Sequence, residues 1–290
     1  MLFSIIIPYF NENVDRVLSA IEYSCSSSIE LLEVILVNNG GTPYAPTKSY
    51  PFEINLIDEG QFLNSPYSAR NRGVEVAKGD CFIFLDATCL PDKEWFKYLL
   101  DNKTLFQTGV LAANIKFYHP EKIISSGNIY DSIINIDNER TVKVSRTAKT
   151  ACLGISRETF FDVGAFDEGV RSGGDVSWTA KYSASGGNIS FHEDWIVYKQ
   201  SRSTFDLIEK QVRVAKGWPA LWKAKGNLAP EFVKKVILCF FPPNPVSLFK
   251  AANRRGVSLS MKDKMKLVCL GWVLRLVSAY GVVYGISRKN

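Results

Sequence analysis

Residues 66–90, PYSARNRGVEVAKGDCFIFLDATCL, carry the strongest fold signal in the chain, because a helix pattern runs directly into a buried strand and an acidic turn. Pro66 suits the first turn of a helix and Gly79 suits its end. The run CFIFL is apolar on both faces, which is typical of a strand covered by helices on both sides of its sheet. It ends in Asp86, whose carboxylate could hold a metal that clamps a phosphate. The residue two positions further, where a second carboxylate would help to grip that metal, is Thr88.

The same alternation of strand and helix extends over the first 110 residues. Short apolar runs predict strands at residues 3–10, 31–41 and 52–58, and the pattern between them predicts a helix over residues 14–24. Apolar strands separated by helices indicate an α/β fold with a mainly parallel, Rossmann-like sheet flanked by helices. In such sheets, ligands bind at the carboxyl ends of the strands. Four polar residues fall at those ends: Tyr9, Asn38, Asp58 and Asp86.

The rest of the chain changes character near residue 203. Before it, strands are expected in the pieces 109–119, 149–156, 187–193 and 194–200, and a helix from about residue 175 to residue 184. After it, the chain becomes helical and rich in Lys, Arg and Trp. We therefore expect one α/β domain over residues 1–220 and a helical C-terminal extension over residues 221–290.

Composition indicates an ordinary folded protein, with 46% hydrophobic and 22% charged residues among 290. The net charge of +6 is concentrated from Lys210 onward, which suits either a solvated basic surface or an anionic partner such as a membrane or phosphates. None of the six cysteines has the spacing of a zinc or redox motif, so buried free thiols in a reducing compartment are expected. The N-terminus has no secretion-signal pattern, which predicts a cytoplasmic protein.

Five sequence blocks follow one another along the chain: SIIIPYFNEN (4–13), VNNGGT (37–42), SARNRGVEVAKGDCFIFLDA (68–87), SGGDVSWTAK (172–181) and VYKQSR (197–202). Together they resemble the family-2 glycosyltransferases of the GT-A fold, of the bacterial surface-polysaccharide type, over roughly residues 1–220. The resemblance implies transfer of a sugar from a nucleotide-sugar donor to an acceptor hydroxyl, with inversion at the anomeric carbon. It places the nucleotide over residues 1–110 and the acceptor over residues 111–220.

The resemblance implies that the catalytic base is the acid of the GGD block, which is Asp175 here. The reaction needs such a group, because the acceptor hydroxyl must lose its proton as it attacks. The alternative is that Asp175 only caps a helix after two glycines.

The resemblance also places the SARNRG helix beside the donor phosphates, where Arg70 or Arg72 could pair with phosphate oxygens. The alternative for each arginine is a surface salt bridge. The full set of expected donor-binding residues is Pro8, Tyr9, Asn11, Asn38, Arg70, Asp86, Thr88, Lys199 and Arg202.

Two departures from the family pattern concern the metal. The family has Asp-X-Asp where this chain has Asp86-Ala87-Thr88, and many relatives have a metal-binding His where this chain has Lys199. An ammonium cannot coordinate a cation and would repel it, so no metal site is favoured and Lys199 is expected to neutralise the leaving phosphate. The alternatives are Mg or Mn bound through Asp86, with His192 as a rival ligand, or a shifted register that leaves Lys199 exposed.

A third departure is Asn38, where many relatives have an Asp that accepts the N3–H of uracil. An amide carries both a donor and an acceptor, so Asn38 could pair with cytosine. This favours a CMP-activated sugar, with UDP-linked and other nucleotide sugars as the alternatives.

Residues 267–286 are almost entirely apolar, with Arg275 as their one charge, and basic clusters flank them. The central Arg makes a membrane span improbable. A helix at the surface of an anionic membrane is one interpretation, which would place the enzyme peripherally at the inner face of the cell membrane. The other is a helical pair packed on the catalytic domain.

The leading hypothesis is thus an inverting glycosyltransferase of surface-glycan biosynthesis, acting on a glycan or a lipid-linked glycan and on no nucleic acid. A rival within the fold is a metal-dependent UDP-sugar enzyme. A rival of another class is a catalytically dead GT-A domain that serves as a binding module.

Overall fold

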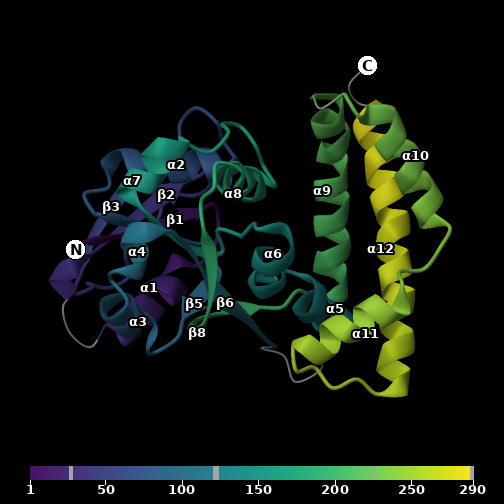
Figure 1. Cartoon of the computed structure of the whole chain (residues 1–290), viewed down its shortest axis with the longest axis horizontal. Helices are drawn as coiled ribbons and strands as arrows, with labels where there is room; N and C mark the ends of the chain where they lie inside the picture. The colour runs from purple at the N-terminus through teal and green to yellow at the C-terminus, as the bar shows by residue number, and fades with distance from the viewer. Residues whose placement is uncertain (26–28, 120–123, 225, 288–290) are drawn as a thin grey trace. The chain divides into compact units, whose positions relative to one another are not determined.

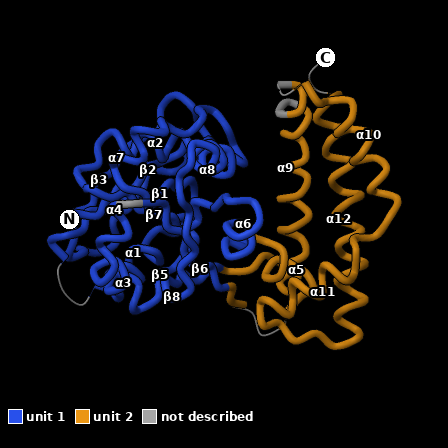
Figure 2. The backbone as a smooth tube through the Cα atoms, in the orientation of Figure 1, with its two compact units in different colours: residues 1–116, 136–199 blue, residues 117–135, 200–290 orange. Residues whose placement is uncertain are grey.

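The computed structural model describes residues 1–25, 29–119, 124–224 and 226–287. The chain forms two compact units (Figure 2): residues 1–116 and 136–199 make unit 1, and residues 117–135 and 200–290 make unit 2. The division at residues 199–200 lies earlier than the expected boundary at residue 220. It does so because the helix over residues 204–224 packs with the later helices and with a segment from the middle of the chain.

Unit 1 is built on an eight-stranded sheet in the order β3-β2-β1-β4-β7-β6-β8-β5 (Figure 1). The pairs β3–β2, β2–β1 and β1–β4 are parallel, whereas β4–β7, β7–β6 and β8–β5 are antiparallel. The sheet is therefore mixed, where a mainly parallel one was expected, because apolar runs do not encode strand direction. The strands are β1 (Phe3–Tyr9), β2 (Leu32–Asn38), β3 (Glu53–Asp58), β4 (Cys81–Leu85), β5 (Cys89–Pro91), β6 (Val110–Tyr118), β7 (Cys152–Ser156) and β8 (Ile189–Gln200).

Helices flank this sheet, and their starts follow from the sequence. Asn13 caps α1 by accepting from the N–H of Asp15, and Ser65 caps α2 by accepting from the N–H of Ser68. Strands β1, β2 and β4 are buried along their whole length, so they form the centre of the core. The helical segments of unit 1 are α1 (Val14–Ser24), the 3-10 helix η1 (Ile29–Leu31), α2 (Pro66–Val76), α3 (Trp95–Asp101), α4 (Leu105–Thr108), α6 (Asn138–Ser145), α7 (Arg157–Val163) and α8 (Gly174–Ala184).

Unit 2 is helical: α5 (Ser126–Ile134), α9 (Thr204–Ala224), α10 (Leu228–Cys239), α11 (Pro245–Arg254) and α12 (Met261–Ser287). The long helix α12 packs on α9, α10 and α5 (Figure 1). Glycines allow this approach, because a Cβ at Gly285 would lie 2.4 Å from the carbonyl oxygen of Lys216. The expected tail is therefore one continuous helix rather than a helical pair, and one of its faces belongs to the core of unit 2.

Two local expectations are wrong. Residues 187–193 and 194–200 form one strand, β8, because the polar pair Glu193 and Asp194 lies exposed on the strand and does not break it. Cys269 is exposed on α12, whereas the other five cysteines are buried free thiols as expected.

Candidate functional site

The carboxyl ends of β1, β2 and β3 lie in register. Tyr9 is paired with Asn38, and Asn38 is paired with Asp58. Three of the four polar residues expected at strand ends therefore lie side by side at one edge of the sheet. Pro8 is one position back, buried within β1 and paired with Val37.

The loop after β2 is held tightly against the loop after β1. The Asn38 side chain accepts from the Gly41 N–H at 2.9 Å and donates to the Gly41 carbonyl at 3.2 Å. The Tyr9 hydroxyl accepts from the N–H of Tyr44 at 3.0 Å, and Asn11 Oδ1 accepts from the N–H of Thr42 at 3.1 Å. These residues therefore build the wall of the candidate nucleotide site, and the Asn38 amide keeps one donor and one acceptor site beyond its bonds to Gly41.

Asn39 is a candidate that sequence reasoning passed over. It is 6% exposed, and its Oδ1 is buried without a hydrogen-bond partner among the described residues. A buried amide oxygen without a partner is costly, so a ligand donor at this place would stabilise it. The available signal was the pair of amides at the strand end, of which only Asn38 was considered.

Asp86 lies between two buried cations. Its Oδ1 accepts from the Arg70 guanidinium at 2.8 Å, and its Oδ2 accepts from the Lys199 ammonium at 3.1 Å. The exposed fractions of Arg70 and Lys199 are only 2% and 3%. Arg70 also donates to the Pro66 carbonyl and lies over the Tyr67 ring. These three side chains together carry one net positive charge.

The pairing of β5 with β8 brings Lys199 to this position. Lys199 is paired with Cys89, and its ammonium donates to Thr88 Oγ1 at 2.5 Å and to Cys89 Sγ at 3.5 Å. The alternative that Lys199 is simply exposed is therefore wrong. The three residues of the departure from the family pattern, Asp86, Thr88 and Lys199, form one contact group.

These residues do not fit a divalent cation. Each oxygen of Asp86 already meets a cation, and a metal bound there would lie beside the Lys199 ammonium. No group of three or more His, Cys, Asp or Glu side chains is placed for a metal in the part of the chain that the structure describes. His192 is engaged elsewhere, with Tyr98 at 2.5 Å and Ser190 at 2.7 Å.

Asp175 lies in the first turn of α8 and is 6% exposed. Its Oδ1 accepts from the Tyr67 hydroxyl at 3.0 Å, and its Oδ2 accepts from the Thr150 N–H at 3.3 Å. Burial, and then the negative charge of Asp175, raise the pKa of Tyr67, so the hydroxyl remains protonated and serves as a donor. Gly173 is the residue that caps the helix, so the capping alternative for Asp175 is wrong.

Two other arginines have carboxylate partners. Arg72 contacts Glu59, Glu75 and Glu168, which matches the salt-bridge alternative and not a phosphate role. Arg202 belongs to unit 2, where its guanidinium lies 3.4 Å from Asp131. A donor-binding role for Arg202 stays a prediction.

A family model and a curated relative match this chain. The glycosyl transferase family 2 model matches residues 4–145. A curated relative, the glycosyltransferase AglE of Haloferax volcanii, is 29% identical over 301 residues, which cover 99% of this chain and 97% of AglE. The predicted resemblance to glycosyl transferase family 2 is confirmed. It is a glycosyltransferase, as predicted.

Solved structures agree on the fold of this glycosyltransferase. The mannosyltransferase PcManGT from Pyrobaculum calidifontis, in complex with GDP-Man and Mn²⁺, is 15% identical with a TM-score of 0.58, covering 97% of this chain and 87% of that chain. S. aureus TarS 1-349 in complex with UDP-GlcNAc is 18% identical with a TM-score of 0.53, covering 74% and 66%. At such identities the likeness shows the fold alone, and the predicted GT-A fold is confirmed.

Proposed function

We propose that this glycosyltransferase inverts the anomeric carbon and needs no divalent cation. It transfers a sugar from a nucleotide-sugar donor to a glycan or lipid-linked glycan acceptor in surface-glycan biosynthesis, at the inner face of the cell membrane. The observation that carries the proposal is the contact of Asp86 with both Arg70 and Lys199.

The leaving phosphate needs a counter-charge, because negative charge grows on it as the bond to the sugar breaks. Arg70 and Lys199 are both buried, so their charges are weakly screened and act more strongly than they would in water. Asp86 and Thr88 hold the ammonium in place before the donor arrives, which is the preorganisation that makes such groups effective. In this proposal the fixed cations replace the Lewis acid of metal-dependent relatives.

Asp175 takes the proton of the acceptor hydroxyl as that oxygen attacks the anomeric carbon. A single displacement, with the nucleotide leaving on the opposite face, inverts the configuration. The Tyr67 hydroxyl donates to Oδ1 and so fixes the orientation of the carboxylate that accepts the proton. Tyr67 is thus a positioning residue for the base.

For the donor, we favour a CMP-linked sugar. Its single phosphate needs less counter-charge than a pyrophosphate, and the amides of Asn38 and Asn39 can both donate to and accept from a cytosine edge. A thermal-shift panel of CMP, UDP, GDP and dTDP, each with and without manganese, tests this. The largest shift with CMP is expected, and a larger shift with UDP would support the alternative donor.

The decisive test is metal removal combined with a lysine variant. Transfer should survive EDTA, and added manganese should change it little. Lys199→Ala should weaken nucleotide binding and slow transfer by about 10²-fold, since a preorganised charge at the leaving group has roughly that effect. Lys97→Ala is the matched control, because Lys97 forms only an exposed ion pair with Asp101 on α3.

Loss of activity in EDTA that manganese restores would contradict the proposal. The double variant Thr88→Asp/Lys199→His offers the converse measurement, because it rebuilds the family's two ligands. It should acquire a dependence on manganese that the unmodified enzyme lacks.

A further inference from the structure

The outer face of α12 is a continuous apolar stripe. Seven residues recur at helical spacing on this face and are exposed: Met265, Cys269, Trp272, Val273, Leu276, Tyr280 and Val283. The opposite face of the same helix packs inside unit 2 through Leu267, Leu270 and Leu274. Trp272 also contacts the end of α10, but the side chains of the stripe as a whole stay exposed, and large exposed apolar surfaces usually mark an interaction site.

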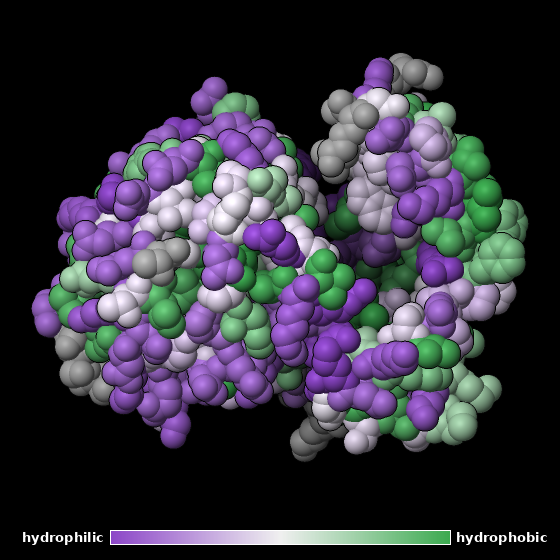
Figure 3. All heavy atoms as spheres, viewed as in Figure 1, coloured by the Kyte–Doolittle hydropathy of each residue, from purple (hydrophilic) through white to green (hydrophobic). Residues whose placement is uncertain are grey.

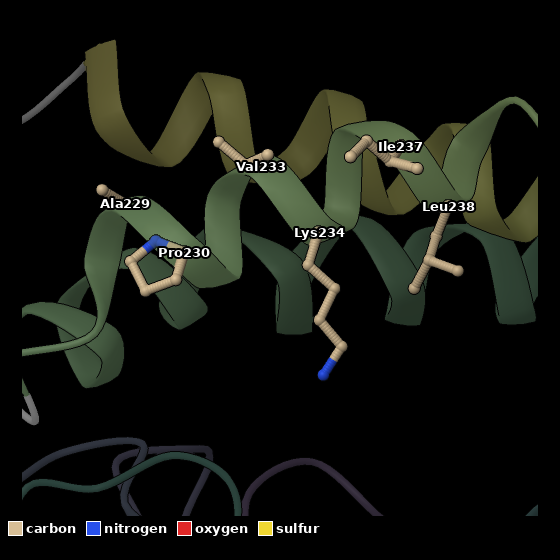
Figure 4. Close-up of a pocket in the computed structure, with 6 residues that line it drawn as sticks. All are labelled: Ala229, Pro230, Val233, Lys234, Ile237 and Leu238. Atoms are coloured by element: carbon tan, nitrogen blue, oxygen red, sulfur yellow. The ribbon is translucent and has the colours of Figure 1, made fainter.

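Helix α10 extends this apolar surface. It packs on α12, and its open groove is lined by Ala229, Pro230, Val233, Lys234, Ile237 and Leu238 (Figure 4). Just after it, Phe240 is 70% exposed and Phe241 is 60% exposed. In the space-filling view, hydrophobic side chains gather over α10 and α12 (Figure 3). We call the exposed apolar residues of α10, Phe240, Phe241 and the α12 stripe the apolar face of unit 2.

Hydrogen bonds join α10 and α12 next to Phe240 and Phe241. The Arg275 guanidinium on α12 donates to the carbonyls of Phe241 and Pro242 at 3.0 and 3.1 Å, and the Trp272 indole donates to the Cys239 carbonyl at 2.8 Å. These bonds satisfy backbone groups at the end of α10, so the turn that carries both phenylalanines is fixed. An aromatic pair on a fixed turn is suited to insertion into an apolar medium.

The positive charge around the apolar face indicates which kind of partner binds there. Residues 200–290 contain 17 Lys and Arg against 4 Asp and Glu, whereas residues 1–199 contain 18 and 25. Lys234 extends from α10 beside Leu238 with a 65% exposed side chain, and its ammonium lies 3.8 Å from the Glu231 carboxylate at the protein surface (Figure 4). Apolar side chains bordered by lysines, with Trp and Tyr among them, match the chemistry of an anionic lipid headgroup layer over acyl chains.

A membrane-spanning arrangement is excluded by the packing of α12. Among the described residues it is the one helix long and apolar enough to cross a membrane. Yet Ser278 on its inner face hydrogen-bonds Gln211 of α9, and Gly281 lies against Ala215 of the same helix. A span would carry α9 and its charges into the hydrocarbon, at a cost of several kcal/mol for each charge. The helix therefore lies at the interface.

We propose that the apolar face of unit 2 rests on an anionic lipid bilayer, with Phe240 and Phe241 inserted and Lys234 against the headgroups. The inference depends on the proposed function in one respect: the enzyme would meet a lipid-linked acceptor at this surface. Its residues are separate from the donor and base groups, so the two proposals can fail independently.

The test is sedimentation of the full chain with vesicles of phosphatidylcholine alone and with added phosphatidylglycerol. Binding is expected only to the anionic vesicles and should weaken as salt is raised, because salt screens the lysines. Phe240→Ser/Phe241→Ser should reduce binding by roughly tenfold or more, and Lys234→Glu by about tenfold. The matched control is Tyr23→Ser/Val144→Ser, which removes two side chains of unit 1 that are 75% and 71% exposed. Donor hydrolysis should stay unchanged in all of these variants.

Cys269 gives an independent readout, because it lies in the stripe and the other five cysteines are buried. An environment-sensitive dye on Cys269 should shift to the blue when anionic vesicles are added. Equal binding to both kinds of vesicle, or an unshifted dye, would overturn the proposal. Sedimentation as a dimer that the phenylalanine variant dissociates would instead assign the face to a second copy of the chain.

Discussion

The buried Asp175 carboxylate accepts hydrogen bonds from several donors, among them the Tyr67 hydroxyl and the Thr150 N–H. Asp175→Asn keeps the shape and an oxygen that can accept from Tyr67 but cannot take a proton. We expect transfer to fall by about 10²-fold or more, with nucleotide binding and thermal stability near those of the unmodified enzyme. Near-normal transfer by the folded variant would remove Asp175 from the mechanism.

Tyr67 offers a finer test of the same site. Tyr67→Phe removes the hydroxyl that donates to Asp175 Oδ1 and accepts from the Gly173 N–H, so the carboxylate loses a contact that fixes its orientation. Steady-state transfer should fall by about tenfold, with nucleotide binding near that of the unmodified enzyme, because only the placement of the base changes. A variant that loses nucleotide binding and transfer together would instead indicate a general structural role for Tyr67.

Single residues of the site were predictable where charge chemistry alone decided the matter. Lys199 in place of a metal ligand implies that it lies at the same site as Asp86, and the structure has their charged groups 3.1 Å apart. The Arg70 contact and the Asn39 oxygen depend on packing across different elements, which spacing does not encode. Arg72 lies in the same SARNRG block as Arg70, but its side chain contacts three carboxylates.

At the scale of elements, strong periodicity and clear stop signals gave reliable predictions. The helix over residues 14–24 matches α1, and the strand at residues 52–58 matches β3 closely. The strand expected at residues 149–156 contains β7, which begins at Cys152. Helices α5 and α6 were not predicted. They begin directly after Ser125 and Asp137, whose side chains cap them, but α6 carries the polar sequence NERTVKVS, which has no clear apolar face.

The loop after β2 provides the element-scale prediction. A Cβ at Gly41 would lie 1.5 Å from the backbone carbonyl of Phe10, so the loop must move away to accept it. Gly41→Ala should weaken nucleotide binding and lower the free energy of unfolding by about 1–3 kcal/mol. Gly60→Ala is the control, because a Cβ there has no neighbouring atom of the described structure within 4 Å. Equal effects of the two variants would contradict a tight fit of this loop.

At the scale of the whole chain, the composition change near residue 203 located the helical unit, but its extent depends on long-range packing. Residues 117–135 join it because α5 packs on α9 and α12. A truncation from about residue 258, which a simple membrane tail would tolerate, removes α12 and exposes the faces of α5 and α9. Such a truncation cannot separate membrane binding from folding, so point variants are needed.

Leu274 and Leu276 are two such positions on α12, of the same residue type and two residues apart. Leu274 is 7% exposed and packs with Leu207 and Leu270, whereas Leu276 is 48% exposed on the apolar face of unit 2. In the absence of lipid, Leu274→Ala should lower the free energy of unfolding by about 2–5 kcal/mol, through lost burial and a cavity. Leu276→Ala should change it by about 0.5 kcal/mol or less. Chemical denaturation of both variants measures the difference. Equal destabilisation would mean that the outer face of α12 is also packed within the protein, and that face would then be closed to a bilayer.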